Sequence, residues 1–129
     1  YVIEPVSNPQ KPMSKGEIGM YYNKQWYQIS INHSEDLQLD VQFLDDEIFN
    51  ALLKIEDTRL DTRIDYLRGD TPLQEIQSNV DLGAYSLAFI LFPNTMDEIK
   101  SIADNHKTMP PKSTWIEPKL PVGMVIQRF

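Results

Sequence analysis

The sequence predicts an α+β domain: a mixed β-sheet with an N-terminal antiparallel hairpin and about three helices. Three observations predict this fold. Apolar residues alternate on either side of a short turn at Asn23-Lys24. Three later stretches carry apolar residues at helical spacing, and an apolar run of strand length lies between the second and the third. The chain has 129 residues, of which 41% are hydrophobic, and this fits one domain spanning residues 1–129.

The predicted hairpin follows a proline-rich polar loop over residues 8–14. On each side of the turn, every second residue is apolar, which is the period of a strand with one buried face. Asparagine tolerates the left-handed conformation that tight hairpin turns require. The alternating residues are Ile18, Met20 and Tyr22 before the turn, and Tyr27, Ile29 and Ile31 after it.

Start signals place the three helices. Asp40 is the expected N-cap of the first, because its carboxylate can accept backbone N–H groups. For the second helix, we expect Thr71 as N-cap, Pro72 at the first helical position, Gln74 in a capping box and Gly83 at the end. The third begins with a capping box of Thr95 and Glu98 and ends at residues 105–107.

Three further strands complete the predicted sheet. Residues 63–67 form a short one, residues 85–92 form a buried central one that is apolar on both faces, and residues 122–128 form the last. The alternation of strand and helix after residue 63 predicts a right-handed crossover between neighbouring parallel strands.

Composition excludes several classes of site and partner. The absence of cysteine excludes disulfides, zinc-thiolate and iron–sulfur sites, and cysteine nucleophiles. His33 and His106 are isolated, so no metal site is expected, and no cofactor is indicated. A net charge of −7 argues against DNA as a partner of this chain. The longest apolar stretch, residues 84–92, is too short to cross a membrane. A cytoplasmic location is expected.

The loop after the third helix is the candidate functional segment. Pro110 and Pro111 fix an extended path, and Lys112, Ser113 and Thr114 then present an ammonium and two hydroxyls that suit a phosphate or carboxylate. Trp115 is the expected structural anchor of the loop. If strands 63–67 and 85–92 are neighbours, polar residues at their ends join the candidate anion-binding set: Arg63, Arg68 and Asn94. The alternative is a purely structural loop.

Several short motifs resemble a known family. They run in order from Leu39-Asp40-Val41, through Arg63-Ile64-Asp65-Tyr66 and Val80-Asp81, to the stretch 109–115 followed by Glu117-Pro118-Lys119-Leu120. From about Gly16 to the last residue, the chain resembles the closing part of the domain of unknown function 1015 family. This resemblance implies a C-terminal part of a longer cytoplasmic protein, as does a start at Tyr1 on an apolar run. It also implies an upstream region similar to ParB (SpoOJ) proteins.

Two classes of function remain open. Family context points to serine or phosphoserine metabolism, so this part would lend an anion-binding loop to a phosphoserine phosphatase-like or other phosphate-handling enzyme. The alternative is a non-catalytic accessory or oligomerisation domain. The family's Asp-Gly-His-His-Arg-like motif has no match here, so we expect this chain alone to be inactive. The expected partners are the upstream domain and a small phosphorylated or amino-acid ligand. The oligomeric state is not indicated.

Overall fold

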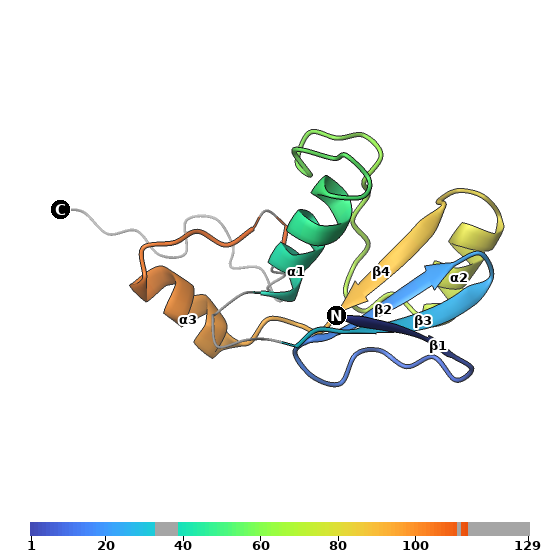
Figure 1. Cartoon of the computed structure of the whole chain (residues 1–129), viewed down its shortest axis with the longest axis horizontal. Coiled ribbons are helices and arrows are strands. Elements are labelled where there is room, and N and C mark those ends of the chain that lie inside the picture. The colour runs from blue at the N-terminus through green and yellow to red at the C-terminus, as the bar shows by residue number, and fades with distance from the viewer. Residues whose placement is uncertain (33–38, 111, 114–129) are drawn as a thin grey trace, which may run out of the picture.

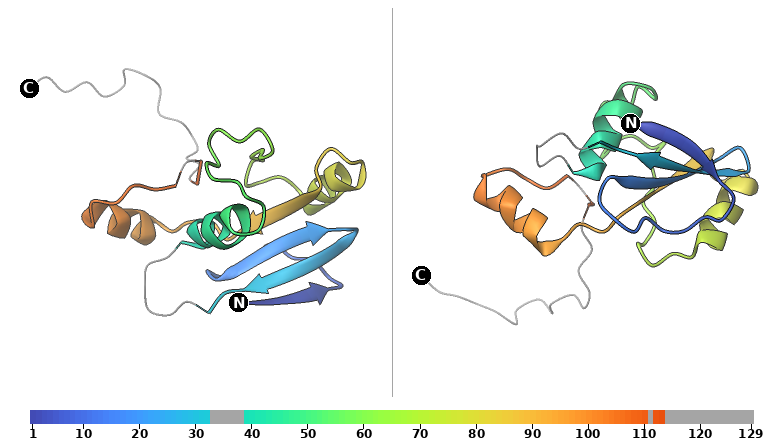
Figure 2. Two further views of the ribbon diagram at one scale, coloured as in Figure 1. Left: turned by 45° about the horizontal axis from the view of Figure 1, so that its top comes forward. Right: turned by 60° about the horizontal axis from the view of Figure 1, so that its bottom comes forward.

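The computed structural model describes residues 1–32, 39–110 and 112–113, and it confirms the α+β class. Four strands form one antiparallel sheet in the order β1-β3-β2-β4 (Figure 1). Their bounds are Val2–Val6 for β1, Glu17–Tyr22 for β2, Gln25–Ser30 for β3 and Leu87–Leu91 for β4. Figure 2 shows helices α1 and α2 on opposite faces of this sheet, so the sheet is the middle layer of the fold.

The hairpin of β2 and β3 forms as predicted. Tyr22 pairs with Gln25 at its end, and the two residues between them are Asn23 and Lys24. Both adopt a positive φ, 49° and 61°, which is the requirement of a two-residue type I′ turn. The turn geometry therefore sets the register that places Ile18 opposite Ile29.

Strand β1 was not predicted. It pairs antiparallel with β3, with Val2 opposite Ser30 and Val6 opposite Trp26. The strand lies at one edge of the sheet, where Pro5 is tolerated because a proline there needs no partner for its missing N–H group. Strand β1 contains a proline and its residues are mostly exposed, so it lacks the alternation of buried apolar and exposed polar residues by which a strand is recognised in sequence.

Each face of the sheet carries its own hydrophobic cluster, because successive side chains of a strand point to opposite faces. On one face, Ile18 and Ile29 pack with the helical residues Phe43, Leu44 and Ile48. On the other, Tyr21 and Trp26 pack with Ile76 of α2. Strand β4 contributes to both clusters, through Phe89 and Leu91 on the first face and through Ala88 and Ile90 on the second.

The first helix joins a short α-helix, α1 (Asp40–Phe43), to a π-helical stretch, η1 (Leu44–Asn50). Its N-cap is Leu39, whose N–H donates to Oε1 of Gln42 at 3.1 Å. The prediction of Asp40 as N-cap was wrong: Asp40 is the first helical residue, and its side chain turns inward. Leu52, which lies just beyond η1, is exposed.

Helices α2 (Leu73–Asp81) and α3 (Met96–Asp104) lie where the capping signals predicted. At α2, however, Pro72 is the N-cap rather than the first helical residue, and no side chain caps the helix. The expected roles of Thr71, Pro72 and Gln74 were therefore wrong. Gly83, at φ 79°, ends α2 in the left-handed conformation as predicted. The capping box of α3 is present, with the N–H of Thr95 donating to Glu98 at 2.8 Å.

Residues 63–67 form no strand, which corrects two predictions. Instead of pairing with the sheet, this stretch is held by local side-chain contacts of the kind that Arg63 makes with Asp61. The sheet is therefore antiparallel throughout the described residues, without the predicted parallel crossover. Strand β4 pairs with β2 alone among these residues and lies at an edge rather than in the centre. The strand predicted over residues 122–128 lies outside the described residues.

A buried carboxylate joins the first helix to the hairpin. Asp40 is 6% exposed, and its two carboxylate oxygens lie 3.0 and 3.1 Å from the backbone nitrogen of Gly16, which donates to them. Gly16 has a φ of 85°, and its carbonyl accepts the N–H of Ile31 at 2.8 Å. A side chain at position 16 would strain this backbone, so glycine suits the position.

Replacing Asp40 with alanine should lower the free energy of unfolding by about 1.5–3 kcal/mol, the range for a hydrogen bond to a charged group. The Gly16 N–H would lose its acceptor in a buried place. Urea denaturation of the 129-residue chain measures this. Asp46→Ala is the matched control, because Asp46 is exposed on the same helix and its loss should change the stability by less than about 0.5 kcal/mol. Equal effects of the two substitutions would contradict the assigned role of Asp40.

Candidate ligand-binding loop

Two members of the predicted anion-binding set lie together. Asn94 follows β4, and its Nδ2 donates to the carbonyl oxygen of Ser113 at 2.7 Å in a partly buried contact. The Ser113 hydroxyl donates to the Pro110 carbonyl at 2.6 Å, so this loop closes on itself. The structure thus brings Asn94 beside the proline-lysine loop, and the bonded polar groups of Asn94 and Ser113 point at protein atoms.

Lys112 lies against an aromatic ring. Its Nζ is 4.6 Å from the centre of the Tyr66 ring, the distance of a cation–π contact. Lys112 has a φ of 55°, so the backbone turns sharply at this residue. The predicted residues Pro111, Thr114 and Trp115 lie outside the described residues, and their roles are not placed.

Lys112 belongs to a group of four residues that we call the Lys112 cluster: Asp65, Tyr66, Tyr85 and Lys112. The Tyr85 hydroxyl donates to Asp65 Oδ2 at 2.7 Å, and the Tyr66 N–H donates to Asp65 Oδ1 at 2.8 Å. These hydrogen bonds, with the nearby Lys112 charge, lower the pKa of Asp65. The hydrogen bond to Asp65 raises the pKa of Tyr85. Three segments distant in sequence meet in this cluster.

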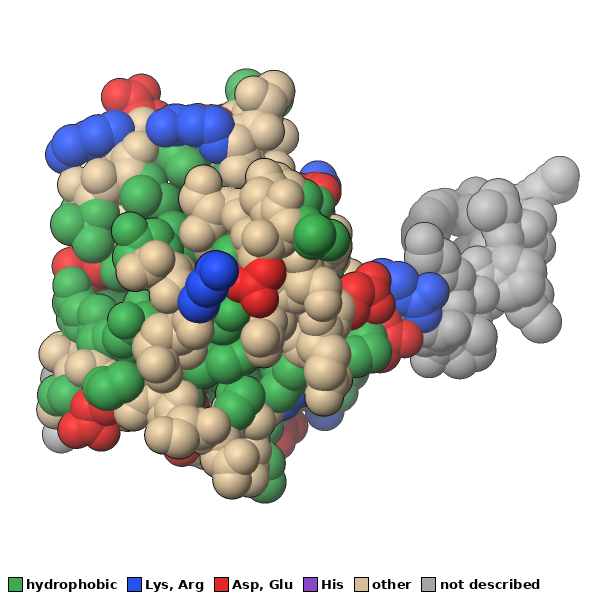
Figure 3. Space-filling view, turned by 90° about the vertical axis from the view of Figure 1, so that its right-hand side faces the viewer, with side chains coloured by type: hydrophobic (Ala, Val, Ile, Leu, Met, Phe, Trp, Pro, Cys, Tyr) green, Lys and Arg blue, Asp and Glu red, His purple; other side chains and the backbone are tan. Residues whose placement is uncertain are grey.

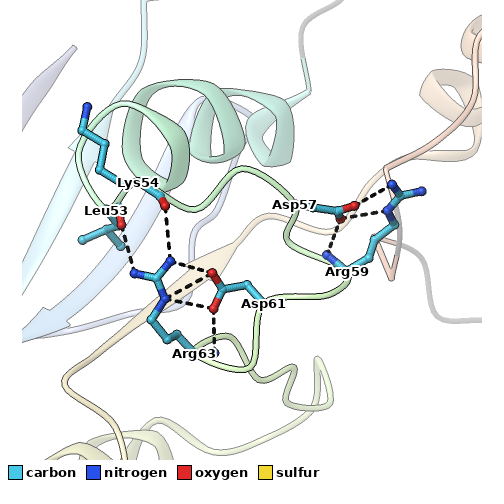
Figure 4. A network of polar contacts seen from close by, with 6 residues as sticks. All are labelled: Leu53, Lys54, Asp57, Arg59, Asp61 and Arg63. Atoms are coloured by element: carbon cyan, nitrogen blue, oxygen red, sulfur yellow. Dashed lines mark hydrogen bonds and ion pairs between the residues drawn. The ribbon is translucent and has the colours of Figure 1, made fainter.

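Arg63 contacts a neighbouring carboxylate and the turn that follows the first helix. Figure 4 shows that its guanidinium donates hydrogen bonds to the Asp61 carboxylate. It also donates to the carbonyl oxygens of Leu53 and Lys54, at 3.2 and 3.3 Å. The shortest contact to Asp61 is 2.5 Å. Hydrogen bonds from the Arg63 side chain and backbone lower the pKa of Asp61 to about 2.

Arg68 also contacts a neighbouring carboxylate. Its guanidinium lies 3.1 Å from Asp70 in an exposed pair. The adjoining Gly69 carbonyl accepts Lys11 Nζ at 2.8 Å. Both predicted arginines are thus engaged in the loop between the first and second helices, where they form contacts within the chain.

Three residues of the Lys112 cluster were missed from sequence. Asp65 and Tyr66 had been assigned to a strand, and Tyr85 to the start of another. The available signal was the repeated spacing Asp-Thr-Arg at residues 57–59 and 61–63, which favours turns in which the arginine folds back on the aspartate. The contact of Tyr66 with Lys112 joins residues far apart in the chain, so no short sequence pattern predicts it.

The clearest cavity in the described part of the chain lies elsewhere. It has a volume of about 180 Å³ and lies between the loop at residues 8–13 and the hairpin. Pro9, Pro12 and Trp26 are among its lining residues, and it includes no member of the predicted anion-binding set.

One face of the molecule is largely uncharged, and the described residues offer no metal site. On the face that carries α2 and the hairpin turn, hydrophobic and neutral side chains dominate, with a few charged ones among them (Figure 3). Within the described ranges, no group of three or more His, Cys, Asp or Glu side chains is arranged to hold a metal ion. None of the helices described is long and apolar enough to span a bilayer.

Comparison with known proteins does not assign this chain to a family. No family model matches this chain, and neither a curated protein nor a solved structure is significantly similar to it. The resemblance to the domain of unknown function 1015 family therefore stays a prediction from the motifs.

We expect the Asp61 carboxyl to titrate at pH about 2, below its ordinary pKa of 3.8. The Arg63→Gln variant should titrate at a higher pH than this but still below 3.8, because the backbone N–H of residue 63 continues to donate to Asp61. Because the folded pKa is lowered, the pair stabilises the fold above pH 3.8, and this contribution is lost as the pH falls toward 2. Carboxyl carbon NMR during an acid titration reports the midpoint directly.

Asp57 provides the matched control for this titration. Arg59 lowers its pKa to about 2 in the same way, since their side chains meet at 2.7 Å. Arg63→Gln should leave the Asp57 midpoint unchanged, and Arg59→Gln should shift Asp57 alone. If both aspartates shift together in either variant, the two pairs are coupled and their assignment as separate contacts is wrong.

Proposed function

We propose that this chain is a non-catalytic accessory domain of a longer cytoplasmic protein that resembles the domain of unknown function 1015 family. One observation carries this proposal: each described residue of the predicted anion-binding set makes polar or charged contacts within the chain. Asn94 binds Ser113, Lys112 stacks on Tyr66, Arg63 binds Asp61, and Arg68 binds Asp70. Side chains that bind one ligand point toward a common position. The four side chains named above instead contact four different parts of the protein.

The proline-lysine loop then acts as a clasp over the end of the sheet. Asn94 anchors it just beyond β4, and Lys112 anchors it on the segment between the first and second helices. An exposed cation–π contact contributes about 0.5–1 kcal/mol, and a neutral hydrogen bond contributes about as much. Together these contacts tie three stretches of chain into one surface, which suits docking against a neighbouring domain. The upstream domain of the same protein is the proposed partner.

An anion-binding role for the same loop is the second candidate, and the exposure of Lys112 favours it. A cation–π contact at an exposed site is weak, so a phosphate that forms a hydrogen bond of about 1.5–3 kcal/mol with the ammonium can displace it. Ser113 lies next to Lys112, on a backbone that Asn94 already holds. In this case, the longer protein would be an enzyme of serine or phosphoserine metabolism, labelled as ParB-like (SpoOJ) by its upstream region.

If the loop is a clasp, Asn94→Ala should lower the free energy of unfolding by about 1 kcal/mol, because it removes a partly buried hydrogen bond. Chemical denaturation of the 129-residue chain gives the value. Asn105→Ala is the matched control: that side chain donates to the Ser101 carbonyl at the same 2.7 Å, but in an exposed local contact. The clasp is refuted if Asn94→Ala is as neutral as we expect the control to be.

The second candidate predicts saturable binding. Titration of the chain, and of the longer protein, with O-phosphoserine should shift the amide NMR signals of Lys112 and Ser113. Lys112→Ala should then weaken binding roughly 10- to 150-fold, the equivalent of a charged hydrogen bond. Serine and inorganic phosphate, as separate ligands, show which group is recognised, and Lys107→Ala removes an exposed charge close by as control. Absence of saturable shifts in both proteins would leave the accessory role alone.

A further inference from the structure

The loop between the first and second helices exposes a large share of the big apolar and aromatic side chains. Of the twelve such side chains that are exposed in the described part of the chain, five lie within residues 52–67. They are Leu52, Leu53, Leu60, Tyr66 and Leu67. Leu60 is the most exposed of the five, at 79%. Exposed apolar side chains gathered in one short segment are typical of a surface that contacts another protein.

Contacts within the chain hold this loop in shape. The Leu60 N–H donates to the Asp57 carbonyl at 3.2 Å, so Leu60 lies on a turn. The Arg63 guanidinium donates to the carbonyl oxygens of the turn that follows the first helix, and the Tyr66 hydroxyl donates to the Thr58 carbonyl at 3.2 Å. A braced loop loses little conformational freedom when a partner binds, which favours association.

Two ion pairs flank Leu60 along the loop. Arg59 binds Asp57 before it, and Arg63 binds Asp61 after it (Figure 4). Both arginine side chains are more than half exposed. The charges of residues 57–63 therefore cancel, although the whole chain carries a net charge of −7. Two copies of such a chain repel one another overall, so a segment with balanced charges is where they can meet at least cost.

The order of these charges suits a second copy of the same loop. Aspartate and arginine alternate at positions 57, 59, 61 and 63, and Leu60 is the midpoint of the series. When two such loops meet antiparallel about Leu60, position 59 of one copy faces position 61 of the other, and position 57 faces position 63. Each facing pair then has opposite charges. A twofold axis generates this arrangement, because every contact across it occurs twice.

We propose that this chain forms a twofold-symmetric dimer through residues 52–67, with Leu60 of each copy packed against the other at the axis. Arg59 of each copy also contacts Asp61 of the other, since the five N–H donors of a guanidinium can serve two carboxylates. An interface made by one loop is smaller than the standard of about 800 Å² per partner, so a dissociation constant on the order of 10 μM is expected. The dimer goes beyond the accessory role and is independent of the proline-lysine loop.

Sedimentation equilibrium of the 129-residue chain tests the dimer. Between about 2 and 200 μM, the mean mass should rise from that of one chain toward that of two. Leu60→Glu should weaken association at least about tenfold, because it places two carboxylates at the axis. Leu82→Glu is the matched control: Leu82 is 84% exposed and lies just beyond α2, outside the loop. The proposal is overturned by an unaltered chain that stays monomeric, or by equal effects of the two substitutions.

An exchange of two charges tests the antiparallel order. Arg59→Asp should weaken the dimer at least about tenfold, because like charges then face each other across the axis. Adding Asp61→Arg should recover most of the lost affinity, since opposite charges face again. Within one copy, the second substitution only breaks another ion pair. Association that is weaker still in the double variant would contradict the proposed contact. The amide NMR signals of the β2–β3 hairpin report whether each variant is folded.

Discussion

The hydrogen bond from the Gly16 N–H to the Asp40 carboxylate is the contact on which the packing of the first core depends. Gly16 precedes β2 and also accepts the N–H of Ile31 after β3, so its backbone joins both ends of the hairpin. Asp40 begins α1, whose following residues Phe43 and Leu44 cover Ile18 and Ile29. A buried carboxylate without a donor is costly, and this requirement fixes where the helix starts relative to the sheet.

The sheet divides the apolar residues into two cores of different character. The cluster beneath α1 and η1 is aliphatic with phenylalanine, whereas the cluster beneath α2 joins Tyr21 and Trp26, whose rings lie 4.8 Å apart. Each of these two aromatic residues satisfies its polar atom on α2: the Tyr21 hydroxyl donates to Asp81, and the Trp26 indole N–H donates to Gln77. The second core therefore also specifies the orientation of its helix.

Local signals explain what could be predicted from sequence. The hairpin followed from period-two alternation and Asn23, and α3 from the capping box of Thr95 and Glu98, because these patterns act within a few residues. Ile64 and Tyr66 are spaced as in a strand, but the segment around them forms turns in which Arg63 bonds to Asp61, so it does not join the sheet. The candidate loop was recognised from its prolines, while its contact with Tyr66 depends on how the intervening chain folds, which no spacing encodes.

The order of the strands has a consequence for folding kinetics. Strands β2 and β3 meet across a two-residue turn, so their pairing costs little loop-closure entropy, and β1 joins β3 from earlier in the same short stretch of chain. Strand β4 joins β2 only after both α1 and α2 have been passed along the chain, and such distant pairings are slow to form. Since β4 supplies side chains to both clusters, its arrival completes the two cores in one step, and its departure opens both. The two halves of the interior therefore form one cooperative unit rather than two independent ones.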